Sequence, residues 1–224
     1  MKLTKGQLAV IVCAAVIIID QILKIWVKIS FYWGEDYEIF SWFHLRFIQN
    51  NGMAFGMELG SKIFLTLFRI VAVSVLTWYL VRLCRNPEIS KGYVVCISLI
   101  TAGAAGNIVD CVCYGEIFTN PMPTDVATFV PWGEGYSTVF QGMVVDMCYF
   151  PLVSFRWPDW MPFVGGDRFS FFDPVFNFAD AAITVGIIIL IFFYYKNLTG
   201  VPEEKSKEDS KTERKIKDCW VCLV

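Results

Sequence analysis

Four long apolar stretches divide the chain, and each is long enough to cross a lipid bilayer as a helix. About 20 consecutive apolar residues span the hydrocarbon core. The stretches run over residues 7–29, 62–81, 92–113 and 174–195. The first is too long for a removable signal peptide and has no small-residue cleavage site, so we expect it to remain in the membrane. The pattern predicts a mainly α-helical membrane protein with four transmembrane helices.

The composition supports a membrane protein and excludes an ordinary soluble domain. Of the 224 residues, 56% are hydrophobic, 17% are aromatic and only 18% are charged, whereas soluble proteins carry about 25% charged residues. So many apolar residues cannot all be hidden in the core of a soluble domain of this length. Basic patches interleaved with aromatic residues are absent from the sequence, which therefore does not predict nucleic-acid binding.

The distribution of charge predicts the orientation in the membrane, because cytoplasmic connections carry an excess of Lys and Arg. We therefore expect both termini and the connection 82–91 in the cytoplasm, with 30–61 and 114–173 facing outward. The basic residues on the cytoplasmic side are Lys2, Lys5, Arg82, Arg85, Lys91 and Lys196, whereas the first outward segment carries Glu35, Asp36, Glu38 and Glu58 against Arg46.

The two outward segments predict different structures. Residues 30–61 are rich in aromatic and β-branched residues and contain the turn signal Asn51-Gly52, so we expect a small β-structure there. Residues 114–173 hold six of the nine prolines and many aromatic residues, a composition that predicts an ordered loop at the membrane interface. We expect one four-helix domain over 1–199, followed by a polar, disordered cytoplasmic tail over 200–224.

Two aspartates are the most unusual polar residues of the chain. Asp146 follows two valines, and Asp180 opens the fourth apolar stretch three residues after Asn177. A carboxylate near hydrocarbon costs about 2.5–3.5 kcal/mol on insertion scales. Two carboxyl groups brought together can share one proton and activate a water molecule. The pair therefore predicts acid–base chemistry, with a proton-coupled transporter and a purely structural polar cluster as alternatives.

Other polar residues inside the spans occur at helical spacings. Asp20 and Lys24 are four apart and can pair on one helix face, either as a structural ion pair or with a role in chemistry. Asn107 and Asp110 follow a run of small residues that permits close helix contact, and they can serve packing or support a nearby site. We expect Arg69 to extend to the interface.

Several other chemistries are disfavoured. His44 is the only histidine, which excludes a zinc motif with two histidines, and the Gly-x-Ser-x-Gly elbow of serine hydrolases is absent. A Ser–Lys pair with Lys24 or Lys28 stays open. Cys219 and Cys222 have the spacing of redox or metal sites but stand without a second ligand pair. The other cysteines fall mostly in or beside apolar stretches, where Cys behaves as a small hydrophobic residue.

Five short polar motifs occur in a fixed order, separated by the four spans. Each is weak alone, but their order is specific, and over most of residues 7–195 they resemble the lipoprotein signal peptidase family, also called signal peptidase II. The motifs are Asp20-Gln-Ile-Leu-Lys24, Asn50-Asn-Gly52-Met-Ala54-Phe55-Gly56, Gly106-Asn107-Ile-Val-Asp110, Val144-Val-Asp146 and Phe176-Asn177-Phe-Ala179-Asp180-Ala-Ala-Ile183.

The resemblance implies four transmembrane helices with a small extracytoplasmic β-cradle, in the bacterial cytoplasmic (inner) membrane, with the active site near the outer face. It implies a monomeric aspartyl endopeptidase that needs no metal or other cofactor and is a target of globomycin. The substrate would be a diacylglyceryl-modified prolipoprotein in membrane lipid, cut before the lipidated cysteine. By motif, Asp146 and Asp180 would be catalytic, and the residues shaping the site or binding substrate would be Asp20, Lys24, Asn50, Gly52, Asn107, Asp110 and Asn177.

The chain departs from the family pattern in two places. Cys111 stands where the family usually has Arg, and we expect Arg156 or Arg168 to supply the cation instead. The stretches 114–143 and 147–173 are longer than usual, which makes the assignment of Asp146 less direct than that of Asp180. Other acids in this region are Asp125, Asp159, Asp167 and Asp173, but none follows two valines.

Two functions of another class remain as alternatives. The first is a small proton- or ion-coupled carrier, because intramembrane Asp, Asn and Lys residues also mark ion pathways. Against it, the acids cluster near the outer face and the sequence has no visible inverted repeat. The second is a non-catalytic membrane protein that binds lipidated peptides.

Overall fold

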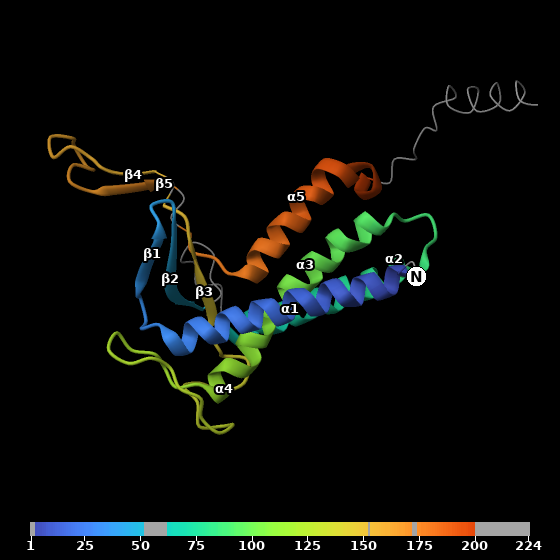
Figure 1. Ribbon diagram of the computed structural model, residues 1–224, viewed down its shortest axis with the longest axis horizontal. Coiled ribbons are helices and arrows are strands. Elements are labelled where there is room, and N and C mark those ends of the chain that lie inside the picture. The colour runs from blue at the N-terminus through green and yellow to red at the C-terminus, as the bar shows by residue number, and fades with distance from the viewer. Residues whose placement is uncertain (1–2, 52–61, 152, 172–173, 200–224) are drawn as a thin grey trace, which may run out of the picture. The chain divides into compact units, whose positions relative to one another are not determined.

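The computed structural model describes residues 3–51, 62–151, 153–171 and 174–199. Helices and strands alternate in blocks along the chain (Figure 1). The elements are α1 (Lys5–Ser30), β1 (Asp36–Phe40), β2 (Phe43–Asn50), α2 (Lys62–Arg85), α3 (Lys91–Val109), a π-helical turn η1 (Asp110–Tyr114), α4 (Gly115–Ile117), β3 (Val144–Tyr149), β4 (Val153–Arg156), β5 (Arg168–Phe171) and α5 (Phe178–Thr199).

Two compact units make up the chain. Residues 1–188 contain α1 to α4, the strands and the first turns of α5. In the second unit, which begins at Ile189, α5 continues to Thr199 with one residue of non-helical backbone, Tyr194 (φ −125°, ψ 19°).

Four helices are long and apolar enough to cross a membrane, as the hydrophobic pattern predicts: Lys5–Ser30, Lys62–Arg85, Lys91–Ile117 and Phe178–Tyr195. The fourth begins later than residue 174, the expected start, because Asn177 caps it. The Asn177 Oδ1 accepts a hydrogen bond of 2.9 Å from the backbone N–H of Asp180. Such a side-chain bond satisfies an N–H group that has no partner within the first helical turn.

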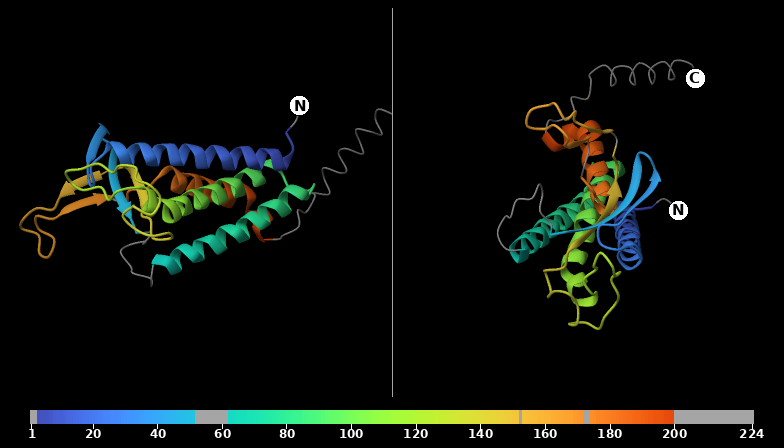
Figure 2. Two further views of the ribbon diagram at one scale, coloured as in Figure 1. Left: turned by 90° about the horizontal axis from the view of Figure 1, so that it is seen from below. Right: turned by 90° about the vertical axis from the view of Figure 1, so that its left-hand side faces the viewer.

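Small residues on α3 allow the helices to pack closely. In the left view of Figure 2, α3 lies between α1 and α2, and it contacts both of them. A Cβ atom on Gly103 would overlap the carbonyl oxygen of Ala179 in α5, and one on Gly106 would lie 2.8 Å from Asp20 Oδ2. The backbone of α3 can therefore approach polar groups of α1 and α5 only because these positions lack side chains.

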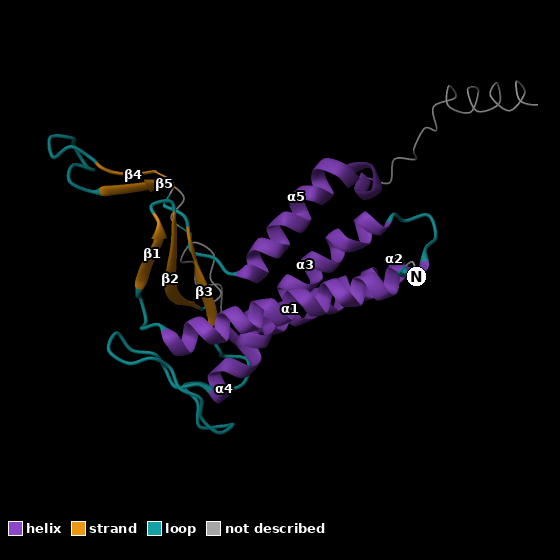
Figure 3. Ribbon diagram, in the orientation of Figure 1, coloured by secondary structure: helices purple, strands orange, loops and turns teal. Residues whose placement is uncertain are grey.

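The expected β-structure in 30–61 is confirmed, but the sheet contains one more strand than that segment supplies. Strands β1, β2 and β3 form an antiparallel sheet in that order. Figure 3 shows these strands near the end of α1 that lies farther from the N-terminus. One face of the sheet packs on α1 and on the π-helical turn through a buried cluster that includes Val27, Phe47, Tyr114, Val145 and Met147. The sheet is thereby fixed to the ends of the helices.

The segment 114–173 is an ordered connection, as its composition predicts. Residues 118–143 form no regular helix, yet Phe118 is 0% and Ala127 is 2% exposed. A single bridge joins Phe118 to Phe129, and the backbone N–H of Val130 donates to the Ile117 carbonyl. The sequence did not predict β3 or the two-stranded sheet of β4 and β5, which also lie in this segment.

The beginning of α1 lies beside the α2–α3 connection. The Lys5 ammonium donates to the backbone carbonyls of Asn86 (2.7 Å) and Pro87 (2.9 Å), and the Lys91 ammonium donates to that of Leu3 (2.7 Å). These bonds bring two of the basic regions of the chain to one end of the helices, opposite the three-stranded sheet in Figure 1.

We predict that Gly103→Ala destabilises the protein, whereas the same substitution at Gly6 does not. A Cβ at Gly103 would overlap the Ala179 carbonyl oxygen, while one at Gly6 has no atom within 4 Å. Overpacking of this kind costs about 1–3 kcal/mol. Thermal unfolding of both variants in detergent measures the difference. Equal unfolding temperatures would contradict the close contact of α3 with α5.

Candidate active site

Asp146 and Asp180 come from different elements and are joined through Asn177. Asp146 lies on β3 and is 2% exposed, and Asp180 lies in the first turn of α5. The backbone of Phe176 pairs with that of Cys148 on β3, which places the next residue, Asn177, beside Asp146. The Asn177 Nδ2 donates to Asp146 Oδ1 at 2.6 Å, and its Oδ1 caps Asp180. One amide side chain thus contacts both acidic residues.

Two further asparagine side chains donate hydrogen bonds to the carboxyl groups of Asp146 and Asp180. The Asn50 Nδ2 donates to Asp146 Oδ2 at 3.1 Å, and the Asn107 Nδ2 donates to Asp180 Oδ1 at 2.8 Å. Each carboxyl group is therefore oriented by hydrogen bonds from fixed elements, namely β2 for Asp146 and α3 for Asp180. Fixed orientation of both groups is what acid–base chemistry on a shared water molecule needs.

The environment of Asp146 favours its protonated form. Burial, together with the neighbouring charge of Asp180, raises the pKa of Asp146 from 3.8 to about 7. The hydrogen bonds from Asn50 and Asn177 act in the opposite direction but do not cancel these effects. Near neutral pH the pair can therefore hold one proton, so that one carboxyl group can donate a hydrogen bond while the other accepts a proton.

Behind the acidic pair lies a fully buried ion cluster. Lys24 Nζ is 2.8 Å from Asp20 Oδ2 and 2.8 Å from Asp110 Oδ2, and all three side chains are 0% exposed. The expected pairing of Asp20 with Lys24 is confirmed. It is part of a larger cluster, because Asp110 joins it from another helix. Lys24 also donates to Asn107 Oδ1 at 2.7 Å, which links the cluster to the amide that holds Asp180.

The two buried acids of the cluster hold the backbone next to the candidate catalytic residues. Asp20 Oδ1 accepts from the backbone N–H of Ala179 at 2.9 Å, and Asp110 Oδ2 accepts from that of Val145 at 3.4 Å. Ala179 and Val145 directly precede Asp180 and Asp146. The cluster thus sets the positions of both aspartates through their neighbours.

Sequence reasoning missed Gln21 and Tyr114, which complete the buried network. The Gln21 amide donates to Asp110 Oδ1 at 2.9 Å and to the Gly106 carbonyl at 3.2 Å, and it accepts from the Tyr114 hydroxyl at 3.0 Å. Gln21 lies inside the first motif, beside Asp20, and this position was a signal that could have identified it. Tyr114 closes a π-helical turn, which no local pattern indicates.

Among the described residues, Arg69 supplies a cation that contacts Cys111. Arg156 is 72% exposed in side-chain surface and donates to the Gly166 carbonyl at 2.9 Å, on the β4–β5 hairpin. Arg69 Nη1 instead lies 3.6 Å from Cys111 Sγ. Arg69 is half-buried and reaches Cys111 in a neighbouring helix, and its extension to the membrane interface stays a prediction. The side chain of Arg168 lies outside the described part of the chain.

The structure gathers the predicted site residues into one network. Eight of the nine are linked by the contacts above, and the ninth, Gly52, lies outside the described residues. Four membrane-crossing helices and an acidic pair at their junction with a small sheet define the class: a polytopic membrane protein with a buried acid–base site.

Comparison with known proteins identifies the family. Residues 12–196 match the sequence profile described as Signal peptidase (SPase) II, and the chain belongs to this family. It is 41% identical over 220 residues to the lipoprotein signal peptidase of Porphyromonas gingivalis, covering 95% of this chain and 97% of that protein. It is 38% identical to the lipoprotein signal peptidase of Amoebophilus asiaticus over 181 residues, 78% of this chain and 72% of that protein.

A solved structure supports the fold. A bacterial membrane enzyme determined by the in meso method at 2.3 Å resolution superposes with a TM-score of 0.59 at 22% identity, covering 89% of this chain and 94% of that one. The resemblance found in the sequence is therefore confirmed, as is the fold class of four apolar helices with a small sheet. The alternative of a proton- or ion-coupled carrier is not supported.

We predict that Lys24→Met strongly destabilises the protein. Without the ammonium, Asp20 and Asp110 remain buried as unpaired carboxylates, and breaking a buried ion pair costs about 3–5 kcal/mol. Arg85→Met, at an exposed position, should change stability by about 0.5 kcal/mol or less. Chemical or thermal unfolding in detergent compares the two. Restored stability in Lys24→Met/Asp20→Asn/Asp110→Asn would confirm the charge as the cause, and equal effects of the two single variants would contradict it.

We predict that the protein loses stability as pH rises toward neutral. The pKa of Asp146 is about 7 in the folded state against 3.8 for a free side chain, so between these values the folded state binds more protons than the unfolded state. Stability therefore falls across this window, by at most about 1.4 kcal/mol per pH unit. In Asp180→Asn the decline should be shallower, since one cause of the raised pKa is removed. Unfolding measured from about pH 4 to 8 tests this, with the exposed Asp159→Asn as control.

Proposed function

We propose that the chain is an intramembrane aspartyl endopeptidase that removes signal peptides from diacylglyceryl-modified prolipoproteins by cutting before the lipidated cysteine. The observation that carries the proposal is Asn177, whose side chain donates to Asp146 Oδ1 and whose backbone N–H lies 3.5 Å from Asp180 Oδ2, so that both carboxyl groups lie at one site. The names of the relatives, lipoprotein signal peptidases, support the substrate class.

In the proposed reaction, the ionised aspartate takes a proton from a water molecule, whose oxygen attacks the scissile carbonyl carbon. The protonated aspartate donates a hydrogen bond to the carbonyl oxygen, which becomes the hydroxyl of a tetrahedral intermediate. The intermediate collapses, the C–N bond breaks, and the leaving nitrogen takes a proton from the pair. The apparent pKa values of such a reaction belong to the pair and not to one residue.

We expect the resting proton on Asp146 and the negative charge on Asp180. Asp146 is buried on β3, and burial disfavours its charged form. Asp180 lies in the N-terminal turn of a helix, where the helix dipole favours an anion, and the backbone N–H of Asn177 lies 3.5 Å from its Oδ2. The two environments thus push the two carboxyl groups toward different roles, the arrangement that acid–base catalysis near neutral pH requires.

The proposed location is the bacterial cytoplasmic membrane, with both termini in the cytoplasm and the site near the outer face. Support comes from the basic residues Lys5 and Lys91, which meet at one end of the helices, while Asp146 lies in the sheet at the other end. The diacylglyceryl group of the substrate would stay in lipid, so membrane-bound precursors are favoured over soluble peptides. We propose a monomer that acts without a metal or other cofactor.

We predict that Asp146→Asn and Asp180→Asn each lower cleavage of a diacylglyceryl-modified prolipoprotein by at least about 100-fold, because each removes one partner of the proton transfer. Asp159→Asn, at a carboxylate that is 87% exposed, should cleave like the wild type. A gel-mobility assay in detergent micelles measures cleavage, with globomycin expected to block the wild type.

Retained cleavage in Asp180→Asn would falsify the proposed dyad. Cleavage lost in Asp180→Asn but retained in Asp146→Asn would keep the family activity and assign the second acid to another residue of 114–173. A folded wild-type protein that cuts no lipidated precursor would contradict the proposed function altogether.

A further inference from the structure

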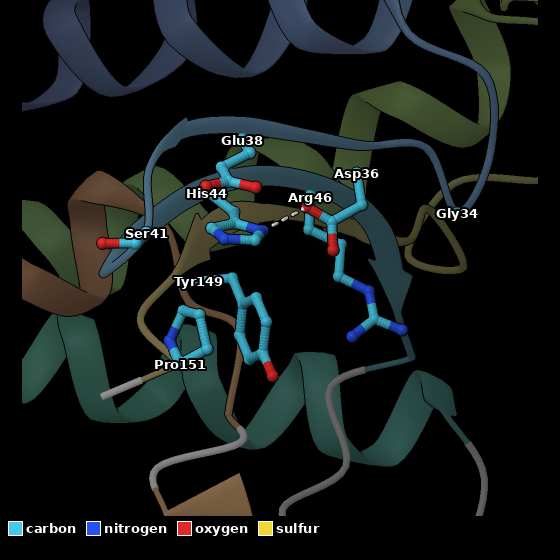
Figure 4. Close-up of a pocket in the computed structure, with 8 residues that line it drawn as sticks. All are labelled: Gly34, Asp36, Glu38, Ser41, His44, Arg46, Tyr149 and Pro151. Atoms are coloured by element: carbon cyan, nitrogen blue, oxygen red, sulfur yellow. Dashed lines mark hydrogen bonds and ion pairs between the residues drawn. The ribbon is translucent and has the colours of Figure 1, made fainter. Parts of the chain in front are cut away.

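A polar cavity lies on the exposed face of the three-stranded sheet. Its volume is about 430 Å³, and its lining includes side chains from β1, β2 and β3, among them Asp36, Glu38, His44, Arg46 and Tyr149. In Figure 4 the side chains of His44, Arg46 and Tyr149 surround one open space, with Asp36 and Glu38 at its upper edge. The contacts that hold the acidic pair together involve none of these five residues.

Two of the strands that line this cavity, β2 and β3, also carry residues of the candidate active site. Strand β2 bears His44 and Arg46 and ends at Asn50, which donates to Asp146. Strand β3 bears both Asp146 and Tyr149, and Tyr149 is the cross-strand partner of His44. Three residues of strand correspond to about 10 Å. Asp146 and Tyr149 are three residues apart and so point to opposite faces of β3. An extended peptide beside β3 alternates in the same way, so with its scissile bond at Asp146 a side chain about three residues away is directed to the face of Tyr149 and the cavity.

The charged side chains of the cavity differ in whether their polar atoms have partners. His44 Nδ1 lies 2.8 Å from Asp36 Oδ1, so this acid has a partner. The Arg46 guanidinium lies over the ring of Tyr149, with its central carbon 5.4 Å from the ring centroid. Its Nε is buried and has no hydrogen-bond partner among the described residues. Since buried donors in proteins nearly always have a partner, the Arg46 guanidinium is incompletely bonded by the described residues.

We propose that this cavity is a substrate subsite that takes an acidic side chain, Asp or Glu, from the third or fourth residue of the mature segment. Arg46 binds its carboxylate, and Tyr149 supports the guanidinium from below. The inference rests on the proposed function and names a preference of that same site. The mature segment is the part involved because it leaves the membrane beyond the lipidated cysteine, on the side where the sheet lies.

A guanidinium matches a carboxylate well, because its planar N–H groups can make two parallel hydrogen bonds to the two oxygens. Glu38 is exposed to solvent and lies beside His44 in Figure 4, away from the Arg46 guanidinium. Water and salt screen an exposed charge strongly, so Glu38 opposes an incoming acid only weakly. The position of the cavity, on the strands that bear Asp146 and Asn50, favours a substrate side chain over a lipid headgroup.

The test compares lipidated substrates that differ only at positions 3 and 4 of the mature segment, with Asp, Asn, Ala or Lys. For the wild type we predict a kcat/KM at least about tenfold higher for Asp than for its isostere Asn, the size of a lost charge-assisted hydrogen bond. The effect should lie mainly in KM, because the contact is present in both the ground state and the transition state.

Variants of Arg46 show whether the cavity causes the preference for Asp over Asn substrates. Arg46→Gln should cleave the Asp and Asn substrates with about equal kcat/KM. Arg46→Lys should keep part of the preference for Asp, and Arg46→Glu should prefer Lys. Arg82→Gln, whose guanidinium stacks on Trp78 in α2, serves as the matched control and should keep the wild-type preference.

The outcomes separate this inference from the proposed function. If the wild type cleaves the Asp, Asn and Lys substrates equally well, the peptidase stands and the subsite is refuted, even if no Arg46 variant folds. If none of the substrates is cleaved, the proposed function itself fails. If Arg46→Gln changes activity only with the phospholipid composition of the vesicle, and the order of substrates is unchanged, the cavity holds a lipid headgroup and the inference is wrong.

Discussion

A single buried ammonium group holds the site together. Lys24 Nζ neutralises Asp20 and Asp110 inside a helical bundle where no water reaches any of the three side chains. Two buried carboxylates without a cation would be very unfavourable, because each loses its hydration. Each acid also accepts a hydrogen bond from a backbone N–H group. Asp20 accepts from Ala179, and Asp110 accepts from Val145. The charge of one lysine thus determines where a helix begins and where a strand lies.

The same lysine also fixes the direction of the hydrogen bonds that reach the acidic pair. An ammonium group can only donate, so the Asn107 oxygen must face Lys24 and its amide nitrogen must face Asp180. Asn177 is oriented similarly, because its oxygen accepts from the Asp180 backbone while its nitrogen donates to Asp146. Both amides therefore present donors to the carboxyl groups. An amide turned the other way would place oxygen against oxygen, so the network allows one arrangement.

Local patterns in the sequence predict only part of this arrangement. The four spans follow from runs of apolar residues, and the Asp20–Lys24 pair follows from a spacing of four on one helix. The pairing of Lys24 with Asp110 joins residues on different helices, and no periodicity indicates it. Strand β3 was missed because six residues in a proline-rich segment have no distinctive alternation, and its partner β2 lies about a hundred residues earlier in the chain. The contact of Arg69 with Cys111 likewise depends on helix packing.

A strand and a helix together carry the acidic pair, and under the proposed function each has a separate part in positioning it against a peptide. The start of α5 supplies Asp180 with a favourable helix dipole and with the backbone N–H of Asn177. A helix cannot align an extended substrate, whereas a strand presents its side chains at the same repeat as an extended chain. Asp146 and Tyr149 lie on the same strand, and Tyr149 pairs across the sheet with His44, so a peptide extended beside β3 would run in register with both positions. Since Asp110 bonds the backbone just before Asp146, the buried cluster also fixes β3 relative to the helices that carry Asp20, Lys24 and Asp110.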